Sequence, residues 1–206
     1  MPFKSFEKSL TQLQRIGQGI PRVCRSGRQY EVDIELMLEQ AGIEIDAVPL
    51  ADKGIVAWIS LSGRKLYVDI GLADKDWLEK RYRFTLAEEY SHTILHKDLF
   101  VGIATPEQWV KKWQGLPEEI YRRLDQQAKE LAGILLMPED TFRPRMIALR
   151  DDFANIEGAS GNMSLEQKAR IAINVRKTLI DDYNVSEHAC SIRIQRLAYP
   201  KDLFSV

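Results

Sequence analysis

The sequence predicts an α+β fold that is mainly helical and carries one small three-stranded sheet with antiparallel strands. Two observations lead to this class. Three short runs rich in β-branched and aromatic residues follow one another in the first third of the chain, and longer segments with apolar residues at helical spacing fill much of the rest. The chain has 206 residues and 45% hydrophobic content, which is enough to bury a proper core.

The charge and the cysteine content argue against several classes of protein. A formal net charge of -1 gives no overall attraction to nucleic acid or to an anionic membrane. Cys24 and Cys190 lie far apart and outside any CxxC pair, so we expect neither a disulfide framework nor a cysteine-based zinc site. The chain also lacks a signal-peptide-like start and any apolar run of about 20 residues that would span a bilayer. We therefore expect a soluble cytoplasmic protein with no membrane contact.

The amino-terminal part is expected to supply the sheet. A helix is predicted from Tyr30 to Ala41, where apolar residues recur at helical spacing, and Gly42 is placed to end it. The strand-like runs are IEIDAVPL, GIVAWISL and RKLYVDI, with turns expected at Gly54 and at Ser62–Gly63. An antiparallel arrangement is the simplest way to pair three short neighbouring strands.

The remainder of the chain is expected to be largely helical. Pro138 should end the second long helix, and the Ser-x-x-Gln pattern of Ser164 and Gln167 can form a capping box at the start of the third. The expected helices are Trp77–Leu99, Glu118–Met137, Ser164–Asp182 and a short one after Ser186, with a loop over residues 152–163.

Three parts are expected along the chain: a lead-in with a short helix at 1–29, a core at 30–150 and a helical carboxy-terminal region at 151–206. The last helix is amphipathic, carries Arg193 and Arg196, and is similar to the second helix of a helix-turn-helix. DNA contact through residues 183–197 is one interpretation of this segment. A helix that simply packs onto the core is the other.

The segment RYRFTLAEEYSHTILH, residues 81–96, carries the first candidate site residues. On a helix, Glu88 and His92 are four residues apart and lie on one stripe that is apolar at both of its ends. Burying a carboxylate and an imidazole without partners costs several kcal/mol. A bound cation is a natural source of compensation.

The second long helical run repeats this anomaly at Asp125, which lies in an apolar stripe beside the small residues Ala128 and Ala132. Small residues let another helix approach closely. Two helices meeting at these positions would join Glu88, His92 and Asp125 into three ligands with room for a water, as in a catalytic metal site. Two carboxylates and one imidazole bind zinc, and they also suit manganese or iron.

Glu89 adds a candidate base next to the first of these ligands. In the H-E-x-x-H arrangement of zincins, the Glu beside the first ligand acts on the attacking water as a general base. The corresponding string here is Glu88-Glu89-Tyr90-Ser91-His92, with a carboxylate in place of the first imidazole.

Each of these residues also has an ordinary structural interpretation. Thr85 and Glu88 form an S/T-x-x-E capping box if the helix begins at Thr85. His92 alone is typical of a hydrogen-bonded core histidine. His96, four residues further on, is a secondary ligand candidate that otherwise lines the site or packs beneath it. Asp125 can pair on the surface with one of three cations, namely Arg122, Arg123 or Lys129.

The segments RFTLAEEYSHTILH and AKELAGILLMP resemble the ImmA/IrrE metallopeptidase family, also called the domain-of-unknown-function family 955. Members typically have R-F-T-L-A-H-E-x-x-H-x-x-x-H, followed by E-x-x-A-N-x-F-A-x-x-L-L-M-P. The resemblance covers roughly residues 30–200 and is densest at Arg83–His96 and Asp125–Pro138. It implies a zincin-like domain with one divalent metal, of which zinc is the first expectation.

Carried over by position, the resemblance makes Glu88, His92 and Asp125 the metal ligands and Glu89 the catalytic residue. Glu88 and Asp125 differ in type from the usual His and Glu. The family implies a metal-dependent endopeptidase whose substrate is a repressor-type protein, such as a helix-turn-helix repressor. The alternative is a catalytically inactive or toxin/antitoxin-type regulatory binding module on the same scaffold, with a structural metal or none.

Overall fold

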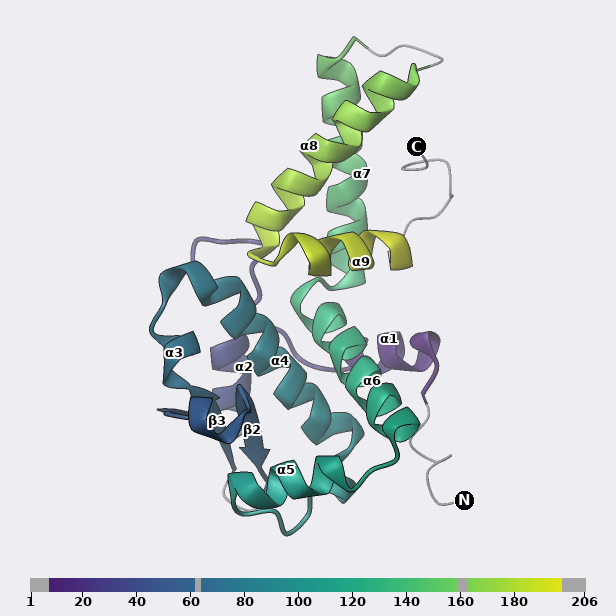
Figure 1. Ribbon diagram of the computed structural model, residues 1–206. Coiled ribbons are helices and arrows are strands. Elements are labelled where there is room, and N and C mark those ends of the chain that lie inside the picture. Colours follow the sequence, from purple (N-terminus) through teal and green to yellow (C-terminus); the bar gives the residue numbers. More distant parts are fainter. Residues whose placement is uncertain (1–7, 62–63, 159–162, 198–206) are drawn as a thin grey trace. The chain divides into compact units, whose positions relative to one another are not determined.

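The computed structural model describes residues 8–61, 64–158 and 163–197 (Figure 1). They divide into two compact units. The first contains Asp33–Leu136 and the segment before Cys24, and the second contains Cys24–Val32 and the segment after Leu136. The predicted α+β class, mainly helical with one three-stranded sheet, is confirmed. None of the described helices has the length and apolar content that a membrane span requires.

The sheet belongs to the first unit and consists of β1 (Glu44–Val48), β2 (Ala57–Ser60) and β3 (Lys65–Asp69). The strand order is β1-β3-β2, with β3 antiparallel to β2 and parallel to β1. The prediction of an antiparallel sheet is therefore correct for one pair and wrong for the other. The chain reverses after β1 at a 3-10 turn, Ala51–Lys53, and again before β3, so β3 regains the direction of β1 and is inserted beside it.

Cross-strand contacts fix the register of this sheet. The rings of Trp58 and Tyr67, directly opposite one another, stack with centroids 4.5 Å apart. On the other side of β3, Lys65 Nζ lies 3.2 Å from a carboxylate oxygen of Glu44. The predicted turn at Gly54 is confirmed by its left-handed φ of 69°. The predicted turn at Ser62–Gly63 lies outside the described residues.

Most of the first unit is helical, as Figure 1 shows. Gly42 follows the end of the second helix with a positive φ of 72°, as predicted. The segment predicted as a helix over residues 77–99 is one long helix with a 3-10 turn at each end, Asp76–Leu78 and Lys97–Leu99. The helices are α1 (Leu10–Gln18), α2 (Ile34–Gln40), α3 (Ile70–Ala73), α4 (Glu79–Leu95), α5 (Pro106–Gln114) and α6 (Glu118–Leu136).

Helix α4 lies between the sheet and α6 and makes its most extensive contacts with α6 (Figure 1). Ala87 on α4 is fully buried, as are Ala128 and Ala132 on α6. The small side chains allow the two backbones to come close, as the sequence suggested. This packing holds the middle of α4 against the first half of α6, where the candidate site residues lie.

The second unit contains α7 (Glu139–Ile156), α8 (Leu165–Tyr183) and α9 (Glu187–Leu197). Helix α8 begins with the predicted capping box of Ser164 and Gln167. The loop predicted over residues 152–163 is wrong for its first part, because α7 continues to Ile156; residues 159–162 of it are not described. The predicted division of the chain at residue 150 falls within α7 and remains a proposal.

A buried carboxylate ties the segment Cys24–Val32 to this second unit. Glu31 is fully buried, and its two oxygens lie 2.9 Å from Arg25 Nη1 and 2.8 Å from Arg28 Nη1. The side-chain amide of Asn184, which ends α8 in a left-handed conformation, donates to the same carboxylate at 3.3 Å. The charge of Glu31 is therefore balanced within the unit, as a buried charge requires.

The contact between α1 and α6 provides a test of the packing around the site helices. A β-carbon at Gly17 would lie 2.4 Å from Ile134 Cγ2 on α6, whose branched side chain is stiff in a helix. We expect Gly17→Ala to lower the free energy of unfolding by about 1–3 kcal/mol. Gly133→Ala on α6 is the control: it meets open space, and we expect a gain of up to about 1 kcal/mol. Equal effects in urea denaturation would contradict the described packing.

Candidate functional site

Two of the predicted ligands meet where α4 packs on α6, and a lysine joins them. Lys129 Nζ lies 2.8 Å from Asp125 Oδ2 and 3.9 Å from Glu88 Oε1. The alternative prediction, that Asp125 pairs with one of three nearby cations, is thus confirmed, and the partner is Lys129. The other two candidate cations, Arg122 and Arg123, pair instead with Glu118 and Glu119 one turn earlier on α6.

The two carboxyl groups of this cluster affect each other strongly. Burial raises the pKa of Glu88 to about 7; the charge of Lys129 opposes this rise, and the charge and hydrogen bonding of Asp125 add to it. Burial lowers the pKa of Lys129, but its hydrogen bond to Asp125 and the two nearby carboxylates outweigh burial and raise it overall. The side chain of Lys129 is 50% exposed, so the cluster is open to solvent on one side.

Glu89 lies on the buried side of α4. Its Oε2 has no hydrogen-bond partner, and burial, followed by the charges of Glu88 and Asp125, raises its pKa well above the ordinary value. Burial without a partner favours the protonated form of a carboxyl group, and a nearby cation favours the ionised form. The capping-box alternative for Glu88 is wrong, because α4 begins at Glu79 and Thr85 lies in its interior.

His92 and His96 form a buried imidazole pair at the end of α4. Their Nδ1 atoms are 2.9 Å apart, which is a hydrogen bond in which one ring donates and the other accepts. Burial lowers the pKa of His92 to about 3 and that of His96 to about 4, so both rings are neutral. This bond leaves His92 only its Nε2 as a metal donor, and it gives His96 the position of a partner that orients a ligand.

An aromatic wall covers His92, and the sequence analysis did not foresee it. The ring centroids of Phe100, Trp109 and Trp113 lie 5.8, 6.4 and 5.1 Å from that of His92, each with its plane steeply inclined. The two tryptophans come from α5, a helix that was not predicted. The signal was present as Thr105-Pro106, an N-cap followed by proline at the first helical position. The wall keeps water away from one side of the imidazole.

The side chains suit a divalent ion in donor type, although they do not converge as a set. Two adjacent carboxylates and one oriented imidazole are donors that zinc, manganese and iron accept. Glu89 Oε2 is a further buried acceptor on α4 without a hydrogen-bond partner, and the charge of Lys129 contributes, after burial and His96, to the lowered pKa of His92. Within residues 8–61, 64–158 and 163–197, however, no three His, Cys, Asp or Glu side chains form a group able to hold a metal.

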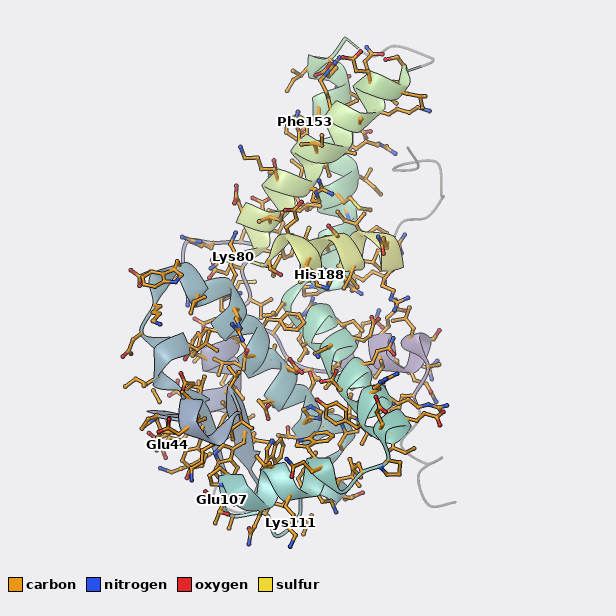
Figure 2. All side chains as sticks on the ribbon, viewed as in Figure 1. Glu44, Lys80, Glu107, Lys111, Phe153 and His188 are labelled. Carbon is orange, nitrogen blue, oxygen red and sulfur yellow. The ribbon has the colours of Figure 1, made fainter. Side chains whose placement is uncertain are left out.

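The segment 183–197, which the sequence offered as a DNA-contacting surface, has one of its two arginines buried. Arg193 is buried, and its Nε donates to the backbone oxygen of Met137 at 2.8 Å. Arg196 is exposed on α9, and so is His188, which Figure 2 labels. The interpretation of α9 as a packing helix accounts for Arg193, because a guanidinium already bonded inside the unit does not reach DNA phosphates.

Comparisons with known proteins agree with the fold and the site helices. A family model described as the IrrE N-terminal-like domain, for peptidases of the M78 type, matches residues 75–195, more than half of the chain. Among solved structures, a Mycobacterium tuberculosis transcriptional regulator is similar in fold, with 14% identity and a TM-score of 0.52. The similarity covers 96% of this chain but 48% of that one, so this chain spans about half the length of the regulator. No curated protein matches the sequence.

The two raised carboxyl pKa values predict an unusual pH dependence of stability. A carboxyl group with a higher pKa in the folded protein keeps a proton that the unfolded chain releases, so stability falls as pH rises. In chelator-treated protein we expect the free energy of unfolding to fall between the ordinary pKa of 4.5 and the value of about 7 for Glu88. Glu88→Gln and Glu89→Gln should each flatten this slope in urea denaturation series.

Glu107 on α5 (Figure 2) supplies the matched control for this experiment. Its hydrogen bond with Lys53 lowers its pKa, so it titrates below the same pH range. Glu107→Gln should therefore leave the slope unchanged. A wild-type slope in both site variants would show that Glu88 and Glu89 ionise normally.

Proposed function

The chain belongs to the family of IrrE N-terminal-like peptidase domains, and from this premise we propose that it is a metal-dependent endopeptidase with its active site at the α4–α6 contact. Glu88, His92 and Asp125 would hold one divalent ion, with zinc first and manganese or iron as alternatives. Glu89 would be the catalytic residue. His96 would orient His92 rather than bind the metal itself.

One observation supports this proposal most directly: Glu88 and Asp125, from two different helices, share a single cation, the ammonium of Lys129. Neighbouring carboxylates from separate helices repel each other, and a positive charge between them stabilises both charged forms. The hydrogen bond between His92 and His96 adds support, because an imidazole that ligates a metal commonly has its other nitrogen hydrogen-bonded.

The residues of the chain have separable tasks in this proposal. A divalent metal supplies Lewis-acid polarisation of a peptide carbonyl and eases deprotonation of water. Glu89 accepts that proton on its carboxylate and returns it to the leaving amine. Its buried oxygen suits this exchange, because burial raises its pKa well above the ordinary value and so strengthens it as a base. Trp109 and Trp113 exclude bulk water from the side of His92.

The substrate class follows from the family and not from the geometry. We infer a repressor-type regulatory protein, such as a helix-turn-helix repressor, as the protein that is cleaved. The reaction is assigned to the cytoplasm, where such repressors act. Nucleic acid is the less favoured partner, because Arg193 is occupied within its own unit.

A second candidate is a catalytically inactive regulatory module that binds a partner protein on the same scaffold. The observation that favours it is the ion pair of Lys129 with Asp125, which balances charge in the site without any metal. The two candidates differ in one respect that can be measured: the module would not need the carboxyl group of Glu89, and the peptidase would.

Glu89→Gln provides the decisive test. With divalent metal added in excess, we expect this variant to bind metal as the wild type does and to lose cleavage by about 10²–10⁴-fold, the usual contribution of a general base. The measurement compares new protein amino termini, found by mass spectrometry, after wild-type or variant protein is added to a native lysate of the source cells. New termini within repressor proteins should appear with the wild type alone.

Glu107→Gln is the control variant, because it changes an exposed glutamate of α5 outside the site. It should cleave as the wild type does. If Glu89→Gln produced the same termini at the same rate, the mechanism would be wrong. If neither protein produced any, while both bound a partner equally, the inactive binding module would be the better account.

A further inference from the structure

The ammonium of Lys129 lies at the contact between α4 and α6. It lies between the two carboxylates that the proposed metal site requires, hydrogen-bonded to Asp125 and within 4 Å of Glu88. One side chain of the chain itself thus lies near two of the three proposed ligands.

Charge balance decides how this ammonium affects a metal. When both carboxyl groups are ionised, two carboxylates and one ammonium together carry a net negative charge. Adding a divalent ion would make the net charge of the cluster positive. Without the ammonium, the same ion would neutralise the two carboxylates. Like charges a few ångströms apart repel appreciably even near a protein surface. A metal and the ammonium therefore compete for one place.

We propose that Lys129 is a built-in counter-cation of the Glu88–Asp125 pair, and that a divalent metal binds at this site only by displacing it. The inference rests on the proposed metal site and adds to it a determinant of metal affinity. Lys129 can leave without a large structural change, because its side chain is half exposed and long enough to extend into solvent.

No other described charge takes the same place. The other cations that could face the cluster from α6, Arg122 and Arg123, are engaged with Glu118 and Glu119. Glu89 and His96, on the α4 side, contribute no positive charge, because the pKa of His96 is lowered and Glu89 is an acid. Lys129 is thus the group whose removal should change the affinity for a metal.

The test measures metal affinity and does not depend on peptidase activity. Chelator-treated wild-type protein, Lys129→Met, Lys129→Gln and Lys129→Arg would be titrated with Mn²⁺ and with Zn²⁺ by isothermal calorimetry. We expect Met and Gln at this position to tighten binding by roughly tenfold or more, a change that corresponds to about 1.4 kcal/mol per tenfold step. Arginine keeps the charge and should bind metal as weakly as the wild type.

Two controls assign the effect to this cluster. Lys111, an exposed lysine on α5 (Figure 2), gives the matched variant Lys111→Met, which should leave affinity unchanged. Adding Asp125→Asn to Lys129→Met should abolish the gain, because the carboxylate that receives the metal is then lost. Thermal unfolding of each variant with and without chelator gives a second readout: only Lys129→Met and Lys129→Gln should melt at a clearly lower temperature when metal is removed.

The outcomes separate this inference from the proposed function. If Lys129→Met and Lys129→Gln bind metal no more tightly than the wild type, including the case in which none of them binds, the inference is overturned. Tight binding by the wild type would overturn it as well and would leave the peptidase proposal intact. Tighter binding by the two variants without cleavage by any of the proteins would support the inference and count against the peptidase.

Discussion

The close contact between α4 and α6 is the constraint on which the candidate site depends. Fully buried alanines on both helices allow the backbones to approach, and the same approach forces the carboxyl groups of Glu88 and Asp125 together. Adjacent carboxylates repel unless a proton or a cation intervenes. In this protein both occur: the raised pKa of Glu88 favours a proton, and Lys129 supplies the cation. The close packing of α4 on α6 therefore requires the proton on Glu88 or the ammonium of Lys129 that stabilises the two carboxyl groups.

One side of the site is buried, and the other side is exposed to solvent. Phe100 and the two tryptophans of α5 enclose His92, and burial keeps both imidazoles neutral, whereas the ammonium of Lys129 reaches solvent. A neutral, oriented imidazole on the same helix as one of two accessible carboxylates is consistent with the proposed hydrolysis, in which a substrate would enter from the solvent-exposed side. The same gradient also suits a surface that recognises a basic or metal-bearing partner. Both proposed functions, hydrolysis and partner recognition, therefore use the same α4–α6 contact.

Local sequence signals predicted the site helices well because helical spacing carries the relevant information. The stripe of Glu88 and His92, the helix before Pro138 and the glycine after α2 all follow from residues close in sequence. The parallel pairing of β1 with β3 did not follow, because strand order depends on contacts distant in sequence. Spacing also places Lys129 and Asp125 one turn apart, but it cannot tell that α4 brings Glu88 to the same ammonium.

Two differences from the quoted family pattern, at Glu88 and Lys129, have opposite charges and lie on facing helices. The pattern has histidine where this chain has Glu88, and asparagine where it has Lys129. The first difference adds a negative charge to α4, and the second adds a positive charge on the facing side of α6, within 4 Å of it. Lys129 alone would still pair with Asp125, whereas Glu88 without Lys129 would be a partly buried acid beside another carboxylate, which is costly. As a pair the two differences add no net charge to the helix contact. The proposed first ligand, Glu88, is therefore an acid of a type that binds metals, and the neighbouring helix carries the cation that we propose competes with the metal.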